Sequence, residues 1–152
     1  MNKKITALTL GVLLLALSIS AEAQQPGKIF RIGYLDPSNA SGNATLLKAF
    51  HQELNKLGWI EGKNIVIEHR FADQNTERLP EHAVELVRLK VDLIVVTGTA
   101  PALAAKNASA SIPIVMIAAS GPVEAGLVDS LARPGRNITG LTSLAVELKT
   151  KR

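Results

Sequence analysis

The sequence contains no cysteine in 152 residues, so disulfide bonds and thiolate chemistry are excluded. A folded chain of this composition must rely on its hydrophobic core alone. If the protein is exported, the lack of disulfides suits a bacterial periplasm better than a eukaryotic secretory route. The three histidines, His51, His69 and His82, share no metal-ligand spacing. The sequence therefore predicts no metal site.

An excess of charge of one sign is also missing from the body of the chain. The 17 basic and 13 acidic residues include Lys3, Lys4 and Glu22 near the N-terminus. Three further basic residues fall within residues 149–152, so residues 24–148 carry 12 of each sign. This balance predicts no basic face for nucleic acid, and we expect no nucleic-acid partner.

The common catalytic signatures are absent as well. The chain has no G-x-S-x-G turn, no cysteine nucleophile and no G-x-x-x-x-G-K-[ST] phosphate loop. Asp36 is the only carboxylate in the three loops that we expect to face a ligand, so a paired-carboxylate mechanism lacks its second member. Before Pro37, Asp36 has the position of a turn residue. The sequence predicts a protein that is not an enzyme and uses no cofactor.

The N-terminus has the pattern of a secretory signal peptide. Lys3 and Lys4 precede the apolar run ITALTLGVLLLAL, and AEA at residues 21–23 supplies the small residues that signal peptidase reads. The apolar run is too short to span a bilayer comfortably. We expect cleavage after Ala23, export to the periplasm and a mature chain that begins near Gln24.

The remaining chain alternates predicted strands with predicted helices. The strands span residues 28–35, 64–71, 91–97, 112–119 and 138–142. The helices span residues 45–58, 77–90 and 122–132, together with an alanine-rich helix that opens after Thr97. The helix over residues 45–58 carries one apolar stripe, formed by Leu46, Leu47, Phe50, Leu54 and Leu57.

This alternation predicts one α/β domain over residues 24–142, with a doubly wound parallel sheet. We expect a flavodoxin-like strand order 2-1-3-4-5, with the alternating second strand at an edge. In such sheets ligands bind beyond the carboxyl ends of the strands, where the strand order reverses. Three loops should meet there: residues 36–43, 97–100 and 118–121.

The junction Thr97-Gly98-Thr99-Ala100 is the strongest candidate for binding. The first turn of a helix leaves backbone N–H groups unpaired and carries the positive end of the helix dipole, which attracts a carboxylate or phosphate. Gly98 would let a ligand approach the backbone, and Thr99 would cap the helix or donate its hydroxyl outward. The simpler alternative is that Thr97 and Thr99 only cap the helix.

Other proteins of this fold fit the residues less well. Residues 38–45, SNASGNAT, have the spacing of a flavodoxin phosphate loop, but the later loops contain no aromatic residue to hold a flavin. A receiver domain would need Asp at the end of the third strand, where this chain has Thr97-Gly98. The export signal opposes both alternatives.

Taken together, several stretches resemble the ABC-transporter substrate-binding proteins of the tryptophan/tyrosine-transport type. The matching stretches cover most of the mature chain in order: RIGYL, LGWIEGKNIVIEHRFAD, RLPEHAVELVRLKVDLIVVTGTAPALAAK, IPIVM, PVEAGLVDSLARPGRNITGLT and LAVELKTKR. The resemblance implies the N-terminal lobe of a type I periplasmic binding protein, which presents a small organic solute to an ABC permease in the inner membrane. An aromatic amino acid is the solute that the family suggests.

The resemblance also implies a ligand site and a second lobe. The implied ligand-binding residues are Ser38, Thr97, Gly98, Thr99, Ala100 and Ser120. Gly121 stands where the family commonly has Asp, which leaves open how a ligand amine is recognised. Residues 143–152 would begin a second lobe that the sequence does not contain. Two alternatives remain open: a dimeric half-domain that acts as an interaction module, and a flavodoxin-like cofactor binder.

We predict that residues 24–142 form a folded core of their own. Limited proteolysis should leave this region as a resistant fragment, and circular dichroism should show mixed helix and strand. An unstructured region in either measurement would contradict the prediction of an independent core.

Overall fold

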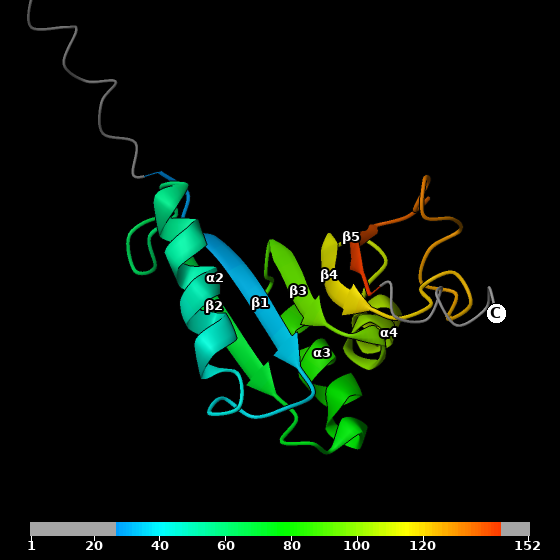
Figure 1. Ribbon diagram of the computed structural model, residues 1–152. Helices are drawn as coiled ribbons and strands as arrows, with labels where there is room; N and C mark the ends of the chain where they lie inside the picture. The colour runs from blue at the N-terminus through cyan, green and yellow to red at the C-terminus, as the bar shows by residue number, and fades with distance from the viewer. Residues whose placement is uncertain (1–26, 144–152) are drawn as a thin grey trace, which may run out of the picture.

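A computed structural model describes residues 27–143 of the chain (Figure 1). The predicted signal peptide and residues 144–152 lie outside the described residues. The strands are β1 (Phe30–Asp36), β2 (Ile65–Phe71), β3 (Leu93–Thr97), β4 (Ile114–Ala119) and β5 (Ile138–Thr142). The helices are α2 (Ala44–Lys56), the short 3-10 helix η3 (Thr76–Arg78), α3 (Leu79–Arg88) and α4 (Thr99–Ala108).

The five strands form one parallel sheet in the order β2-β1-β3-β4-β5. β1 pairs with β2 along its whole length and with β3 through residues 32–35. The predicted doubly wound α/β fold and its strand order are therefore confirmed, with β2 at an edge. Because the chain leaves β1 toward β2 but leaves β3 toward β4, the strand order reverses between β1 and β3.

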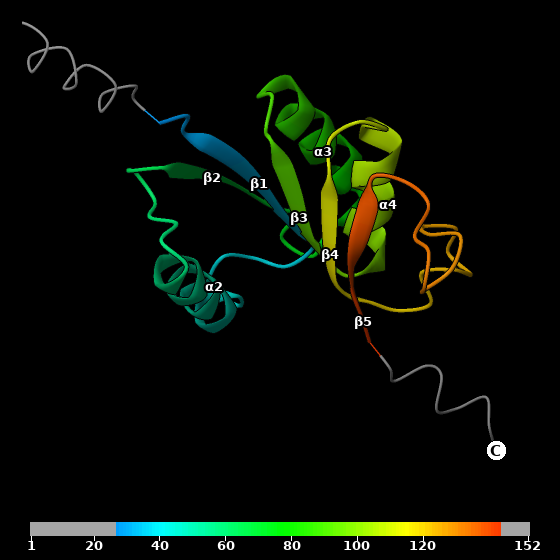
Figure 2. The ribbon, with the colours of Figure 1, turned by 90° about the horizontal axis from the view of Figure 1, so that it is seen from above.

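Helices cover both faces of the sheet (Figure 2). α2 lies on one face, over β1 and β2, and α3 and α4 lie together on the other. Alternate strand residues feed two core clusters. The cluster on the α2 side is built on Ile32, Tyr34, Ile65, Ile67 and Val95, packed against Leu47, Phe50 and Leu54 of α2. The larger cluster joins Leu35, Ile94, Val96, Ile114 and Met116 to Leu86 of α3 and Ala105 of α4.

The helix ends follow from local sequence. Pro80 lies in the first turn of α3, where its missing N–H has no partner to lose. Gly58 has a φ of 84° and lies just after the end of α2, which stops at Lys56, two residues before the predicted end. Two members of the predicted apolar stripe are exposed: Leu46 by 44% and Leu57 by 75%. Leu57 is exposed because it lies beyond the last helical residue, Lys56. Between residues 27 and 143, no helix combines the length and the apolar character that crossing a membrane requires.

The predicted helix over residues 122–132 is wrong. A single turn forms there, closed by the N–H of Leu127, which donates to the carbonyl of Pro122 at 2.8 Å. Gly126 then takes a φ of 68°, a left-handed conformation that a right-handed helix cannot continue through. Leu127 and Val128 are nevertheless buried. The prediction took Pro122 as the first residue of a helix, but only this one turn follows it, and the segment is a loop folded against the core.

β4 and β5 meet in an irregular register. The pairing shifts between Met116 and Ala119, and Ala118 has a φ of 54°. A bulge of this kind redirects the residues that follow the strand. Gly140 of β5 has a φ of 144°, and a Cβ added to it would lie 2.0 Å from the carbonyl oxygen of Met116. Only glycine therefore fits at this position.

We expect Gly140→Ala to lower the free energy of unfolding by about 1–3 kcal/mol or more, because backbone strain adds to a clash with β4. Gly58→Ala is the matched control: its φ is also positive, at 84°, but no atom lies within 4 Å of the added Cβ. Urea denaturation of both variants should show the larger loss at Gly140. Equal losses would contradict the close approach of β5 to β4.

Candidate functional site

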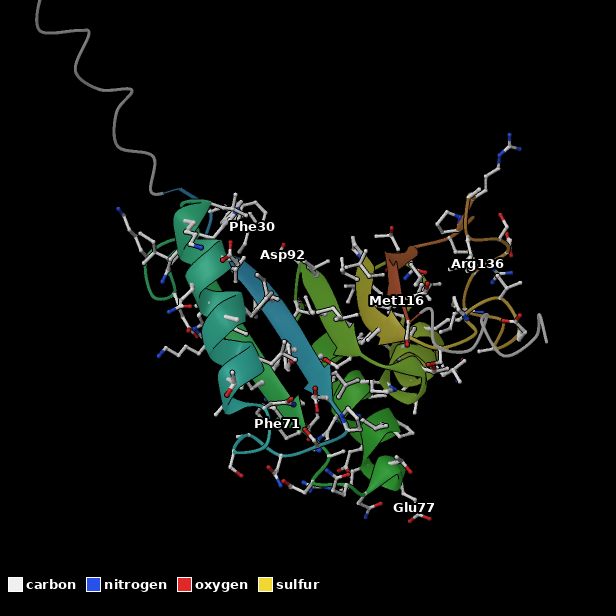
Figure 3. The ribbon with its side chains drawn as sticks, viewed as in Figure 1. Phe30, Phe71, Glu77, Asp92, Met116 and Arg136 are labelled. Carbon is white, nitrogen blue, oxygen red and sulfur yellow. The ribbon has the colours of Figure 1, made fainter. Side chains whose placement is uncertain are left out.

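The carboxyl ends of the parallel strands β1, β3 and β4 lie side by side, at the end of the sheet where these strands finish. We call residues 36–43, 97–100 and 118–121, which follow these strands, the carboxyl edge. Figure 3 shows Phe71, the last residue of β2, at this end, and Phe30 and Asp92 at the opposite end. All six predicted ligand-binding residues belong to the carboxyl edge. Ligands of doubly wound folds bind beyond this end of the sheet.

Asp36 holds Ser38 in place. The Asp36 side chain is 2% exposed, and its Oδ1 accepts hydrogen bonds from the backbone N–H of Ser38 at 2.8 Å and from the Ser38 hydroxyl at 2.7 Å. The side-chain amide of Asn43 donates to Ser38 Oγ at 2.7 Å. Asp36 thus makes the turn that its place before Pro37 predicts. The sequence did not predict that Asp36 is buried or that it accepts a hydrogen bond from the Ser38 hydroxyl.

Tyr34 connects the end of β1 to the end of β3. Its hydroxyl lies 3.2 Å from Thr97 Oγ1 and 3.5 Å from Asp36 Oδ2, and the side chain is buried. Burial raises the pKa of Tyr34 above its usual value of 10, the hydrogen bond with Thr97 lowers it, and the charge of Asp36 raises it. The net pKa is raised, so Tyr34 keeps its proton at neutral pH.

α4 begins without a side-chain cap. Gly98 is the N-cap residue, with φ 94° and ψ 177°, and no side chain accepts from the first turn. The N–H groups of Thr99 and Ala100 precede the helical hydrogen-bond ladder, and Pro101 has no N–H. The predicted capping role of Thr97 and Thr99 is therefore wrong.

Thr99 instead joins α4 to the loop after β4. Its hydroxyl donates to the carbonyl of Ser120 at 2.9 Å and accepts from the N–H of Ser120 at 3.0 Å. The alternative prediction, in which the Thr99 hydroxyl donates outward, is also wrong, because the proton is already used. Thr99 and Ser120 are thus in direct contact, whereas Ser38 and Thr97 connect through Asp36 and Tyr34.

A fourth loop, after β2, packs beside the first. The backbone N–H groups of residues 72, 73 and 74 donate to the carbonyls of residues 36, 38 and 37 at 2.9, 3.0 and 2.8 Å. Asp73 and Gln74 have φ values of 52° and 66°. The sequence-based prediction missed this loop because Gln74 is not a residue type that signals a left-handed turn.

Among the described residues, no three histidine or carboxylate side chains gather as a metal site would require. His51 and His69 stack at 6.0 Å between α2 and β2, beside an open cavity of about 450 Å³. Burial lowers the pKa of His69, the main effect on that ring. His82 lies on the buried face of α3 and is 8% exposed.

The strand order, the helices on both faces and the loops at the carboxyl edge define the class: this is the fold of the periplasmic binding proteins. A family model described as ABC transporter substrate binding protein matches residues 39–150. The chain belongs to this family. The resemblance read from the sequence is therefore confirmed.

Three relatives place the chain within the family. It is 42% identical over 93 residues to a tyrosine-binding protein of Clostridioides difficile, covering 61% of this chain and 27% of that protein. It matches a ligand-free, open substrate-binding protein with adhesive properties from Clostridium difficile, with a TM-score of 0.69 and 34% identity. It also matches an ABC domain in complex with L-Trp from Streptococcus pneumonia, with a TM-score of 0.68 and 25% identity.

All three relatives are longer than this chain. Each of the two structural matches covers 74% of this chain but only 38% of the other. The chain thus spans about a quarter of the curated relative and less than half of the solved ones. By their names, two of these relatives are binding proteins.

We expect Tyr34 to ionise above pH 10. Tyr34 is the only tyrosine in the chain, so ultraviolet absorbance reports its titration alone. Thr97→Val should move the midpoint still higher, because it removes the hydrogen bond that lowers the pKa. A midpoint at or below 10 would contradict the burial of the hydroxyl.

The same shift predicts how stability depends on pH. Because the folded state holds the Tyr34 proton more tightly than the unfolded state, the free energy of unfolding should fall as pH rises above 10 toward the folded pKa. Denaturation of the wild type and Tyr34→Phe across this range isolates the effect. Parallel curves for the two proteins would show that Tyr34 makes no such contribution.

Proposed function

We propose that this chain forms the N-terminal lobe of a solute receptor for an ABC importer. The lobe holds one end of a small organic solute at the carboxyl edge, and the complete receptor presents that solute to a permease in the inner membrane. One observation carries the proposal: α4, a helix without a side-chain cap, begins beside the point where the strand order reverses.

A carboxylate is the group that suits the start of α4. The N–H groups of Thr99 and Ala100 lie in the first turn, where the helix dipole is positive. Ala100 is exposed, and no atom lies within 4 Å of a Cβ built on Gly98. A solute can therefore reach the backbone of the first turn without meeting a side chain at Gly98.

The relatives suggest the class of solute. One is named a tyrosine-binding protein, and another was solved with L-Trp. We propose an aromatic amino acid or a similar solute for this chain. Gly121 itself adds no carboxylate to the loop after β4, although Glu124 Oε2 lies 3.1 Å from the position of a Cβ built on Gly121. The acceptor for the amine of such a solute must therefore come from a residue other than Gly121.

The share of the relatives that the chain spans supports a division into lobes. Residues 24–142 would be the N-terminal lobe, residues 143–152 would lead toward a second lobe, and residues 1–23 would direct export to the periplasm. Receptors of this kind bury a solute by closing two lobes around it. A single lobe buries less of the solute, so we expect weak binding to it alone.

A second candidate is a homodimer of the lobe. In the described part of the chain, β5 ends the sheet with one side unpaired, and Leu141 on this strand is 72% exposed. An exposed strand edge favours pairing with another chain. Solution mass separates the candidates: a monomer with weak affinity supports the single lobe, whereas a dimer with measurable affinity supports the homodimer.

The exposed residue Ala100 offers a direct test of solute binding. Chemical-shift mapping with L-tryptophan and L-tyrosine should perturb the amides of Ser38, Ser120 and residues 97–100. Ala100→Glu places a negative charge in the first turn of α4, which stabilises the helix but repels a carboxylate. We expect about tenfold weaker binding without loss of thermal stability.

Ala100→Gln is the matched control, since it has nearly the same size and no charge. It should bind within a small factor of the wild type. Equal affinity of the Glu and Gln variants would show that the solute carboxylate does not lie at α4. If neither amino acid perturbs the carboxyl edge of the wild type, the proposed solute class is wrong.

A further inference from the structure

Five residues of the carboxyl edge carry a hydroxyl group, and three of them are half-buried, whereas Ser41 and Ser120 are exposed. Each of the three half-buried hydroxyls has a single proton to donate. They belong to Ser38, Thr97 and Thr99. A hydroxyl donates one hydrogen bond and accepts up to two. The direction of the bonds already made inside the protein therefore decides what these groups can offer a solute.

The protons of Ser38 and Thr99 are already used. Ser38 Oγ donates to the Asp36 carboxylate at 2.7 Å and accepts from the Asn43 amide at 2.7 Å. Thr99 Oγ1 donates to the Ser120 carbonyl at 2.9 Å and accepts from the Ser120 N–H at 3.0 Å. Each hydroxyl keeps one free lone pair and has no proton left to donate.

Tyr34 determines which hydroxyl donates in its hydrogen bond with Thr97. The Tyr34 hydroxyl lies between Asp36 Oδ2, at 3.5 Å, and Thr97 Oγ1, at 3.2 Å. A carboxylate only accepts, and its charge attracts the single phenolic proton, so Tyr34 donates to Asp36. Thr97 must then donate to Tyr34.

The negative charge of Asp36 also favours a positively charged group at this site. Asp36 is 2% exposed, and none of the ion pairs within residues 27–143 includes it. A buried carboxylate without a cationic partner favours a positive group nearby. The free lone pairs of the hydroxyls and the negative charge of Asp36 thus favour the same kind of group, a positively charged donor.

We propose that Ser38, Thr97 and Thr99 present hydrogen-bond acceptors to the solute, so that they select its ammonium group and leave its carboxylate to the backbone of α4. Tyr34 and Asp36 act as positioning residues. They accept hydrogen bonds from the Thr97 and Ser38 hydroxyls, respectively, and do not contact the solute. This inference rests on the proposed function and deepens it. It supplies the acceptor for the amine that Gly121 does not provide.

Three indole compounds distinguish binding of the solute's ammonium group from binding of its carboxylate. L-tryptophan has both charged groups, tryptamine has only the ammonium, and indole-3-propionate has only the carboxylate. In chemical-shift titrations of the whole chain, tryptamine should perturb the amides of Ser38 and Thr97. Indole-3-propionate should perturb those of Thr99 and Ala100 and leave Ser38 and Thr97 unchanged.

Tyr34→Phe tests the direction of the Thr97 bond. Without the phenol oxygen, the Thr97 proton is free to turn toward the solute, so the affinity for indole-3-propionate relative to tryptamine should rise several-fold. Phe50→Leu is the control: the Phe50 ring packs 5.9 Å from the Tyr34 ring and makes no hydrogen bond to it. This variant should leave the affinity ratio unchanged.

Two results would overturn the inference: equal perturbation of Ser38 and Thr97 by both probes, or an unchanged affinity ratio in Tyr34→Phe. If none of the three compounds binds, the proposed function fails, and the titration of Tyr34 then decides the inference by itself. A Thr97→Val variant with a higher tyrosine pKa supports Thr97 as the donor. An unchanged or lower pKa overturns it.

Discussion

The pairing of β1 with β2 on one side and β3 on the other is the constraint on which the site depends. This pairing makes β1 a central strand and places the reversal of strand order between β1 and β3. Tyr34 lies opposite Val95 in the register, so its hydroxyl reaches the end of β3. Without that register, the loops that carry Ser38 and Thr97 would have no common support.

The polar groups at this edge are connected before any solute arrives. A buried carboxylate is costly unless hydrogen bonds satisfy it, and Asp36 accepts two from Ser38. The same bonds hold Ser38 in one orientation, while Thr99 and Ser120 hold each other. A preorganised set of polar groups loses less side-chain entropy when a ligand binds to it.

The two faces of the sheet contribute unequally to the core. On the α3 and α4 face, Ile114 and Met116 are 0% and 3% exposed. On the α2 face of the same strand, Val115 and Ile117 are only half-buried, because α2 covers β1 and β2. The main core therefore lies on the side of α3 and α4. The α2 side carries the polar groups of Tyr34, Asp36 and Thr97.

The sequence alone determined the strands, most helices and the order of the sheet, because apolar runs and amphipathic spacing report directly on burial. It also predicted the three loops, since parallel strands bring their carboxyl ends to one edge. Residues 122–132 were mistaken for a helix, because Pro122 suits a helix start but Gly126 takes a left-handed conformation that ends the turn. Only the tertiary structure decided the burial of Asp36 and the contacts that the Tyr34 hydroxyl makes with Asp36 and Thr97. These depend on distances between strands that are far apart in the chain, and no local pattern encodes them.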